Sequence, residues 1–360
     1  MNRVQLDELQ IFNLRNISRA QLEFSNKFNV ISGKNGMGKT NLIEAVYMLG
    51  ALRSFRTSVR KELISYNEKT AKITGIFGDV NYGLKSEIII NPDERKLKID
   101  GKDITQAASH FQKFPMVLFH PGVMELVQGG PEARRRFIDR AMFQADTFYP
   151  SIFRTYKKVI LNRNSMLKKY KIERKDLIPF DHQLAETGSL IVKRRREFIE
   201  SMRPFFKESV YDISMGQDAD IEYNPKIEGD KEDYIKILDE KFSLDKERKY
   251  TTAGPHSDDI LFTLDKKPAK KYASQGQQRT VVLAAKIAET KALTISTKKI
   301  PLLLFDDVSS ELDKDRNRDL FKFLKSMGGQ VFITTTHPDY IDIQEHRKDF
   351  EMHEGKISLL

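Results

Sequence analysis

The pattern of apolar and polar positions near the start of the chain predicts short strands over residues 4–31. The apolar run at residues 28–31 leads directly into a glycine-rich turn. A helix is predicted over residues 40–51, because apolar residues recur there with a period near 3.6, at Leu42, Ile43, Val46 and Leu49. Residues 71–100 predict an antiparallel meander, with a turn at residues 91–93.

The pattern changes after Pro121. Residues 131–210 are rich in charge and predict long helices without sustained heptads. Later segments alternate again, with strands predicted at 258–267, 302–305 and 331–334 and a helix at 275–293. Strands and helices at both ends, with helices between them, predict one α/β domain interrupted by a helical lobe. The predicted division is 1–123 plus 296–360 for the α/β part and 124–295 for the lobe.

Composition adds a preference for anionic partners. The 360 residues contain 61 Lys and Arg against 51 Asp and Glu, a net charge of +10, which favours nucleic acid. A basic protein without such a partner fits the same charge. There are no cysteines, so disulfides, thiol catalysis and Cys-ligated zinc are excluded. We expect a cytoplasmic protein, because the start lacks the apolar run of a signal peptide and no stretch is apolar enough to span a membrane.

The glycine-rich turn matches the phosphate-loop pattern, with Gly33, Gly38, Lys39 and Thr40 at the required spacing. Glycines let successive backbone N–H groups surround phosphate oxygens, and the next helix presents its positive end to them. Lys39 is expected on the β and γ phosphates, and the Thr40 hydroxyl on Mg²⁺. The expected ATP-binding residues of this loop are Gly33, Lys34, Asn35, Gly36, Met37, Gly38, Lys39, Thr40 and Asn41. A chance glycine-rich turn is the alternative.

The apolar run at residues 302–305 ends in Asp306 and Asp307, which is the Walker B arrangement. Asp306 is expected to hold the Mg²⁺ shell, and Asp307 to orient the attacking water. A simple acidic turn after a strand is the alternative. Near the end of the last predicted strand, His337 resembles the switch histidine that senses the γ-phosphate, although a lone surface histidine fits the same position. Residues 309–313 resemble the D-loop that crosses a dimer interface.

A third element precedes the helix predicted at 275–293. Ser274, Gly276 and Gln277 resemble the signature motif of ABC-type ATPases, whose serine contacts the γ-phosphate held by another subunit. A helix start with small residues is an anion site, but a plain helix cap fits the same residues. Lys39 and Ser274 are 235 positions apart, which is too long for a transporter ATPase and too short for the coiled coil of an SMC protein.

The whole chain resembles the RecF family. The resemblance is carried by residues 9–16, 35–45, 53–57, 117–121, 130–139 and 254–259, and by Tyr156, Leu161, Arg163, Asn164, Gln183, Leu184 and Ala185. It implies an ABC/SMC-type P-loop ATPase head with an antiparallel β subdomain and an inserted helical lobe. It also implies ATP-dependent dimerisation, slow ATP hydrolysis, and binding of duplex DNA, gap junctions and single-stranded DNA.

The resemblance further implies action with RecO and RecR at single-strand gaps, RecA loading, replication restart and SOS induction. Two alternatives stay open: a nuclease-linked ATPase, for which the chain leaves no room after His337, and a DNA scaffold that binds nucleotide without turnover. The chain departs from related ATPases at two places. His120 stands where the Q-loop glutamine is expected, with Gln128 as an alternative, and Asp307 replaces the usual glutamate.

Four basic clusters, at residues 53–61, 134–136, 157–169 and 193–196, could contact DNA phosphates. Each also fits an ordinary solvated helix face, and this is the interpretation we prefer for any single cluster. The sequence contains no base-reading motif, so we expect DNA binding to follow structure more than base sequence.

Overall fold

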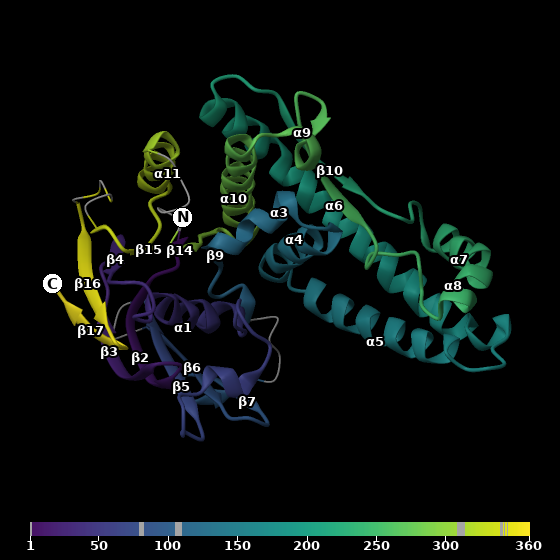
Figure 1. Ribbon diagram of the computed structural model, residues 1–360. Helices are drawn as coiled ribbons and strands as arrows, with labels where there is room; N and C mark the ends of the chain where they lie inside the picture. The colour runs from purple at the N-terminus through teal and green to yellow at the C-terminus, as the bar shows by residue number, and fades with distance from the viewer. Residues whose placement is uncertain are drawn as a thin grey trace. The chain divides into compact units, whose positions relative to one another are not determined.

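The computed structural model in Figure 1 describes residues 2–78, 83–104, 110–307, 314–338, 341, 343 and 345–360. The chain divides into two compact units. Unit 1 consists of Met1–Val123 and Leu293–Leu360, and unit 2 of Met124–Ala292. No helix among the described residues is long and apolar enough to cross a bilayer.

Unit 1 contains a six-stranded core sheet in the order β17-β16-β4-β15-β14-β9. All of its neighbouring strands are parallel except the edge pair β16 and β17. Its strands are β4 (Phe28–Ser32), β9 (Met116–Phe119), β14 (Leu302–Asp306), β15 (Val331–Thr335), β16 (Arg347–His353) and β17 (Lys356–Leu359). Strands β4, β9, β14 and β15 are buried along their whole length, which explains their nearly continuous apolar sequences.

The second sheet of unit 1 is antiparallel throughout, in the order β3-β2-β5-β6-β7-β8. Its strands are β2 (Leu6–Leu14), β3 (Ile17–Glu23), β5 (Ala71–Phe77), β6 (Leu84–Ile90), β7 (Arg95–Ile99) and β8 (Lys102–Asp103). The predicted meander over residues 71–100 is therefore confirmed. A short parallel pair joins β1 (Asn2–Arg3) to β13 (Lys299–Ile300), and a 3-10 turn spans Arg60–Leu63.

Helix α1 (Lys39–Ala51) packs against strands of both sheets, and its apolar residues join one core with them. In Figure 1, α11 (Lys314–Met327) lies on the other side of the core sheet from α1. The phosphate loop thus connects a buried strand to a buried helix.

Unit 2 is mainly helical, as predicted, with a small antiparallel sheet β10-β11-β12. Its helices are α3 (Glu125–Gln128), α4 (Pro131–Ala145), α5 (Tyr149–Leu167), α6 (Ile178–Ser214), α7 (Lys231–Glu240), α8 (Phe242–Arg248), α9 (Ala269–Tyr272) and α10 (Gln275–Thr297), whose last residues enter unit 1. Its strands are β10 (Ala219–Asn224), β11 (Asp259–Leu264) and β12 (Lys267–Pro268), and 3-10 turns span Pro121–Met124 and Arg174–Asp176. Helices α5 and α6 lie side by side (Figure 1).

Candidate nucleotide-binding site

The phosphate loop turns sharply between β4 and α1, and two of its glycines are required by geometry. Gly33 and Gly38 have φ angles of 148° and 113°, in the region that side chains rarely adopt. A Cβ atom on Gly33 would lie 2.4 Å from the Met352 carbonyl oxygen, and one on Gly38 would lie 2.6 Å from the Asn16 Oδ1 atom. The outer loop residues Lys34, Asn35 and Gly36 are exposed.

Lys39 begins α1 and folds back over the loop. Its ammonium group donates hydrogen bonds to the carbonyl oxygens of Gly33 (2.7 Å) and Lys34 (3.1 Å). Burial lowers the pKa of Lys39, while the carboxylates of Asp307 and Asp306 act in the opposite direction. A cation therefore sits at the positive end of a helix, beside a loop rich in backbone donors, which is an arrangement suited to a polyphosphate.

The two Walker motifs meet at the carboxyl edge of the core sheet. The Thr40 hydroxyl donates a hydrogen bond of 3.0 Å to Asp306 Oδ1, and the Thr334 hydroxyl donates one of 2.9 Å to the same oxygen. Thr334 is the register partner of Asp306 across the β14–β15 pair. The sequence did not single out Thr334. The only sequence signal was that Thr334 lies at the end of the predicted strand that precedes His337. This position lies next to Walker B only if that strand and the Walker B strand are neighbours in the sheet.

The two acidic residues of Walker B have different environments. Asp306 is buried, which raises its pKa, and the hydrogen bonds from Thr334 and Thr40 oppose that rise. Asp307 follows the strand with φ 51°, and its N–H donates to the Thr334 hydroxyl oxygen at 2.9 Å. Aspartate adopts this left-handed backbone region more readily than most residues, and the angle marks the turn that ends the strand.

Histidines follow two strands of the same edge. His337 is exposed, two residues after β15, and its N–H donates to the Thr335 hydroxyl oxygen at 3.0 Å. His120 directly follows β9, whose last residue Phe119 pairs with Phe305. The ring centroid of His120 lies 5.4 Å from that of Phe55. Within unit 1, His120 thus follows the strand beside Walker B, which is where the Q-loop residue was expected.

A hairpin tip supports the phosphate loop from the antiparallel sheet. Asn16, in the turn between β2 and β3, donates from Nδ2 to the Met37 carbonyl oxygen at 3.0 Å. Its Oδ1 accepts a hydrogen bond of 2.7 Å from Asn41. Arg56 in turn donates to Asn41 Oδ1 at 2.7 Å. Asn41, expected as a nucleotide contact, therefore also ties α1 to the hairpin and to the segment that contains Arg56.

Glu44, one turn further along α1, is a buried carboxylate at the centre of this support. Arg15 donates two hydrogen bonds, of 2.9 and 3.0 Å, to the carboxylate oxygens of Glu44. The Ser54 hydroxyl also donates to this carboxylate, and the Arg56 guanidinium lies 3.6 Å from it. Planar guanidinium groups suit such two-point contacts with carboxylates. Sequence reasoning missed this role. The sequence signal that could have revealed it is a charged residue between two apolar neighbours, Ile43 and Ala45, within a predicted buried helix.

The signature residues belong to unit 2. The Ser274 hydroxyl oxygen accepts a hydrogen bond of 3.2 Å from the Gln277 N–H, and Gln277 Oε1 accepts one of 2.9 Å from the Ser274 N–H. This reciprocal pattern is a capping box at the start of α10, with Gly276 in its first turn. Gln128, the alternative Q-loop residue, donates to Gln278 Oε1 at 3.0 Å and so lies beside this motif within unit 2. The predicted D-loop, residues 309–313, lies outside the described residues.

One arginine in each of two basic clusters does not belong to a solvated helix face, while Arg136, Lys193 and Arg196 of the same clusters are exposed. Arg134 is buried and forms a two-point ion pair with Asp259. Arg195 is buried in unit 2, where it pairs with Asp139 and donates to the Pro255 carbonyl oxygen. These partners are distant in sequence, which is why the runs of arginines looked like solvated surface.

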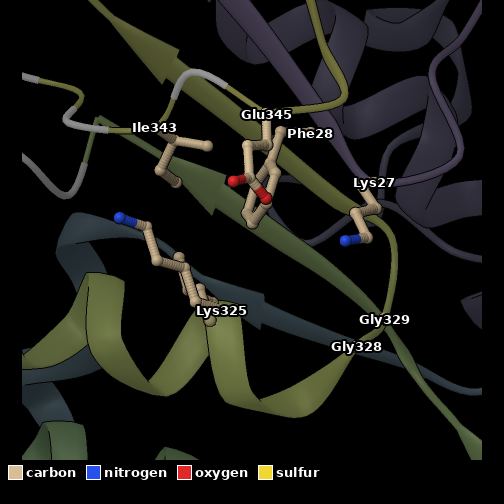
Figure 2. Close-up of a pocket in the computed structure, with 8 residues that line it drawn as sticks. Lys27, Phe28, Lys325, Gly328, Gly329, Ile343 and Glu345 are labelled. Carbon is tan, nitrogen blue, oxygen red and sulfur yellow. The ribbon is translucent and has the colours of Figure 1, made fainter.

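A pocket of about 290 Å³ in unit 1 opens at the amino-terminal ends of β4, β15 and β16 (Figure 2). The Walker motifs lie at the carboxyl-terminal ends of the strands of this core sheet. Phe28 and Ile343 form part of its wall, and Lys27, Lys325 and Glu345 supply its charges. None of the predicted nucleotide-binding residues lines this pocket. The candidate site is therefore the carboxyl edge, where the motif residues gather.

Comparison with known proteins identifies the family. The model of the family described as RecF/RecN/SMC N terminal domain matches residues 5–358. The DNA replication and repair protein RecF of Citrifermentans bemidjiense is 35% identical over 365 residues, covering 98% of this chain and 100% of that protein. The chain belongs to the RecF family of DNA replication and repair proteins. The RecF protein of Alkaliphilus oremlandii is 36% identical, with coverage of 98% and 99%.

Solved structures agree with this membership. The structure described as the recombination mediator protein RecF-ATPrS in the RecFOR pathway superposes with a TM-score of 0.92 at 30% identity, over 100% of this chain and 99% of that one. A second RecF structure, described with ATP, gives a TM-score of 0.91. An Smc head domain from Pyrococcus furiosus, at 18% identity and a TM-score of 0.59, shares the fold. The predicted fold class and the family resemblance are confirmed, and the nuclease-linked alternative is set aside.

Proposed function

We propose that this chain is an ATP-dependent DNA-binding protein of recombinational repair that dimerises when it binds ATP. The observation that carries the proposal is the hydrogen bond between Thr40 and Asp306, which joins the two Walker motifs at one sheet edge. The relatives solved with ATP and ATPrS are RecF proteins of the RecFOR pathway. By this kinship we propose RecO and RecR as partners, single-strand gaps as the site of action, and roles in replication restart and SOS induction.

The residues at this edge fit ATP with Mg²⁺. Thr40 Oγ1 and Asp306 Oδ1 lie 3.0 Å apart. Adjacent ligands of an octahedral Mg²⁺ with bonds near 2.0–2.1 Å are separated by about 2.9 Å. Bound there, Mg²⁺ would neutralise charge on the β and γ phosphates. Lys39 and the backbone of residues 33–41 would hold the phosphates, and Asp306, oriented by Thr334, would keep its oxygen toward Thr40.

Hydrolysis is proposed as a slow step that ends the ATP-bound state. Asp307 would orient a water molecule toward the γ-phosphorus and accept its proton while the bond to the β–γ bridging oxygen breaks. His337 would contact the γ-phosphate, and His120 would take the place of the Q-loop glutamine. Aspartate is one methylene shorter than glutamate and reaches the water less easily, which suits slow turnover.

The second half of the site is proposed to come from another copy of the chain. The Ser274 hydroxyl uses an acceptor position for the cap of α10, so its hydrogen can be donated to a phosphate oxygen. Gly276, Gln277 and the start of α10 would face the same anion. We propose residues 124–295 as the lobe that presents this motif, and residues 1–123 plus 296–360 as the ATPase lobe.

Sedimentation velocity with ATP, with ADP and without nucleotide tests the proposal. We expect wild type to form dimers only with ATP and Mg²⁺. Ser274→Arg should bind ATP but form no dimers, and Lys39→Met should neither bind ATP nor dimerise. A wild-type chain that stays monomeric with ATP, alone and with gapped DNA, would overturn it. The non-hydrolysing scaffold is separated by phosphate release: equal rates in wild type and Asp307→Asn would favour the scaffold.

A further inference from the structure

Helix α5 in unit 2 has two unlike sides. Tyr156, Val159, Ile160, Arg163 and Leu167 are buried, and the helix packs alongside α6. The exposed side and the turn after it carry only positive charge, because no Asp or Glu occurs between Asp146 and Glu173. We call this surface the α5 cationic face, and it consists of Arg154, Lys157, Lys158, Lys168, Lys169 and Lys171.

These six cations differ from several other exposed basic residues of unit 2, which are held in ion pairs. Exposed Arg136, Arg196 and Lys207 each lie within 4.0 Å of a carboxylate, namely Glu132, Glu228 and Asp220. Across the described part of the chain, no ion pair within that distance involves any residue of the α5 cationic face. Charge that is not neutralised inside the molecule is available to an external anion.

The cations form two groups along the helix. Arg154, Lys157 and Lys158 lie near its beginning, and Lys168, Lys169 and Lys171 follow its end. At 1.5 Å per residue along the helix, Lys157 and Lys168 are roughly 17 Å apart. That length corresponds to about five steps of 3.4 Å along the axis of duplex DNA. The uncharged, exposed residues Leu161, Asn162 and Ser165 lie between them.

We propose that the α5 cationic face binds the phosphate backbone of duplex DNA. This inference rests on the proposed DNA-binding function and names the surface that performs it. Single-stranded DNA is bound largely by stacking on rows of aromatic side chains, and here Tyr170 alone is an exposed aromatic residue within the face. A membrane-surface helix needs a continuous exposed apolar side, whereas the apolar side of α5 is buried and Leu161 is the one large aliphatic residue exposed among the cations.

The test compares two matched triple variants by fluorescence anisotropy with a labelled 30-base-pair duplex in ATP. One variant carries Arg154→Gln, Lys157→Gln and Lys158→Gln. The control carries Arg136→Gln, Arg196→Gln and Lys207→Gln, which removes the same charge from paired cations. We expect the first to lose about tenfold or more in affinity near 0.1 M salt and its log–log salt slope to fall by about 2 to 3. We expect the control to stay within about twofold of wild type.

Several outcomes overturn the proposal. Equal losses in both variants would mean that only net charge matters, and an α5 variant with wild-type affinity and slope would exclude this face. A larger loss for single-stranded DNA than for duplex, or a loss confined to anionic phosphatidylserine vesicles, would assign the face to another ligand. ATP-dependent sedimentation of the α5 variant must match wild type. Wild type that binds no DNA would instead overturn the proposed function itself.

Discussion

Thr40 and Asp306 are 266 positions apart in the chain, yet their side chains are joined by a hydrogen bond of 3.0 Å. Thr40 follows the phosphate loop in α1, and Asp306 ends β14. The bond exists because parallel strands end at one edge of a sheet and α1 begins at that edge. Two oxygens suited to one Mg²⁺ are thereby held together by the fold.

Thr334 is predicted to control Mg²⁺ affinity through Asp306. Thr334→Val removes the donor that orients Asp306 Oδ1, so Mg²⁺ affinity in the presence of nucleotide should fall about 10- to 100-fold. A Mg²⁺ titration of fluorescent ATP binding measures this. Thr334→Ser should retain most of the affinity, and Thr336→Val, two residues along, should match wild type. An unchanged Mg²⁺ midpoint in Thr334→Val would contradict the proposed role.

Gly38 is predicted to be poorly replaceable because its backbone angle disfavours a side chain and because an added Cβ must displace the Asn16 side chain that supports the loop. In Gly38→Ala, the new methyl group would lie 2.6 Å from Asn16 Oδ1 in a backbone with φ 113°. Nucleotide affinity should be lost, and the hairpin tip should be displaced from Met37. Gly36→Ala is the matched control, since Gly36 has φ 81° but no atom within 4 Å of the added Cβ. It should show only the backbone cost, about 1 kcal/mol. Chemical denaturation and nucleotide titration compare the two.

Glu44 is predicted to stabilise unit 1 and to place the hairpin tip. Glu44→Ala leaves Arg15 and Arg56 without their shared buried carboxylate. Removing one member of a buried ion pair costs about 3–5 kcal/mol, and the partial exposure of Arg15 points to the lower end. Urea unfolding should report the loss, together with weaker nucleotide binding. Glu94→Ala, which breaks a solvent-exposed pair with Lys96, should leave the unfolding midpoint unchanged.

His256 is predicted to make stability depend on pH. Burial lowers its pKa to about 4, and its Nε2 lies 2.9 Å from the Thr251 carbonyl oxygen while Nδ1 lies 2.6 Å from the Tyr156 hydroxyl. Between pH 6.5 and 4 the unfolded chain binds a proton at this residue that the folded chain does not. The stability is therefore full above pH 6.5 and falls with pH, by about 1.4 kcal/mol per unit.

The measurement is the free energy of unfolding from urea titrations between pH 7 and 4.5. His256→Gln should reduce its slope against pH by about 1.4 kcal/mol per unit. His110, whose pKa burial also lowers to about 4, contributes a separate dependence in unit 1. Equal slopes in wild type and His256→Gln would show that His256 is protonated in the folded chain.

The sequence by itself determined the elements whose signals are local. The phosphate loop is a contiguous pattern between a strand and a helix, and the meander at residues 71–100 consists of short apolar runs with a turn at residues 91–93, so local patterns were sufficient. The order of the motifs and the family resemblance then identified the fold. Asp306 was found as well, because an apolar run ending in acid is also contiguous.

Only the tertiary structure decided which distant side chains meet. Thr334 contacts Asp306 because β15 lies beside β14. Glu44 binds several side chains because the hairpin tip and the segment containing Arg56 both reach α1. Runs of basic residues looked alike in the sequence, yet Arg134 and Arg195 are neutralised by Asp259 and Asp139, while the cations along α5 have no such partners within the described ranges. Ion pairs form between residues brought together by packing, and linear spacing carries no information about that.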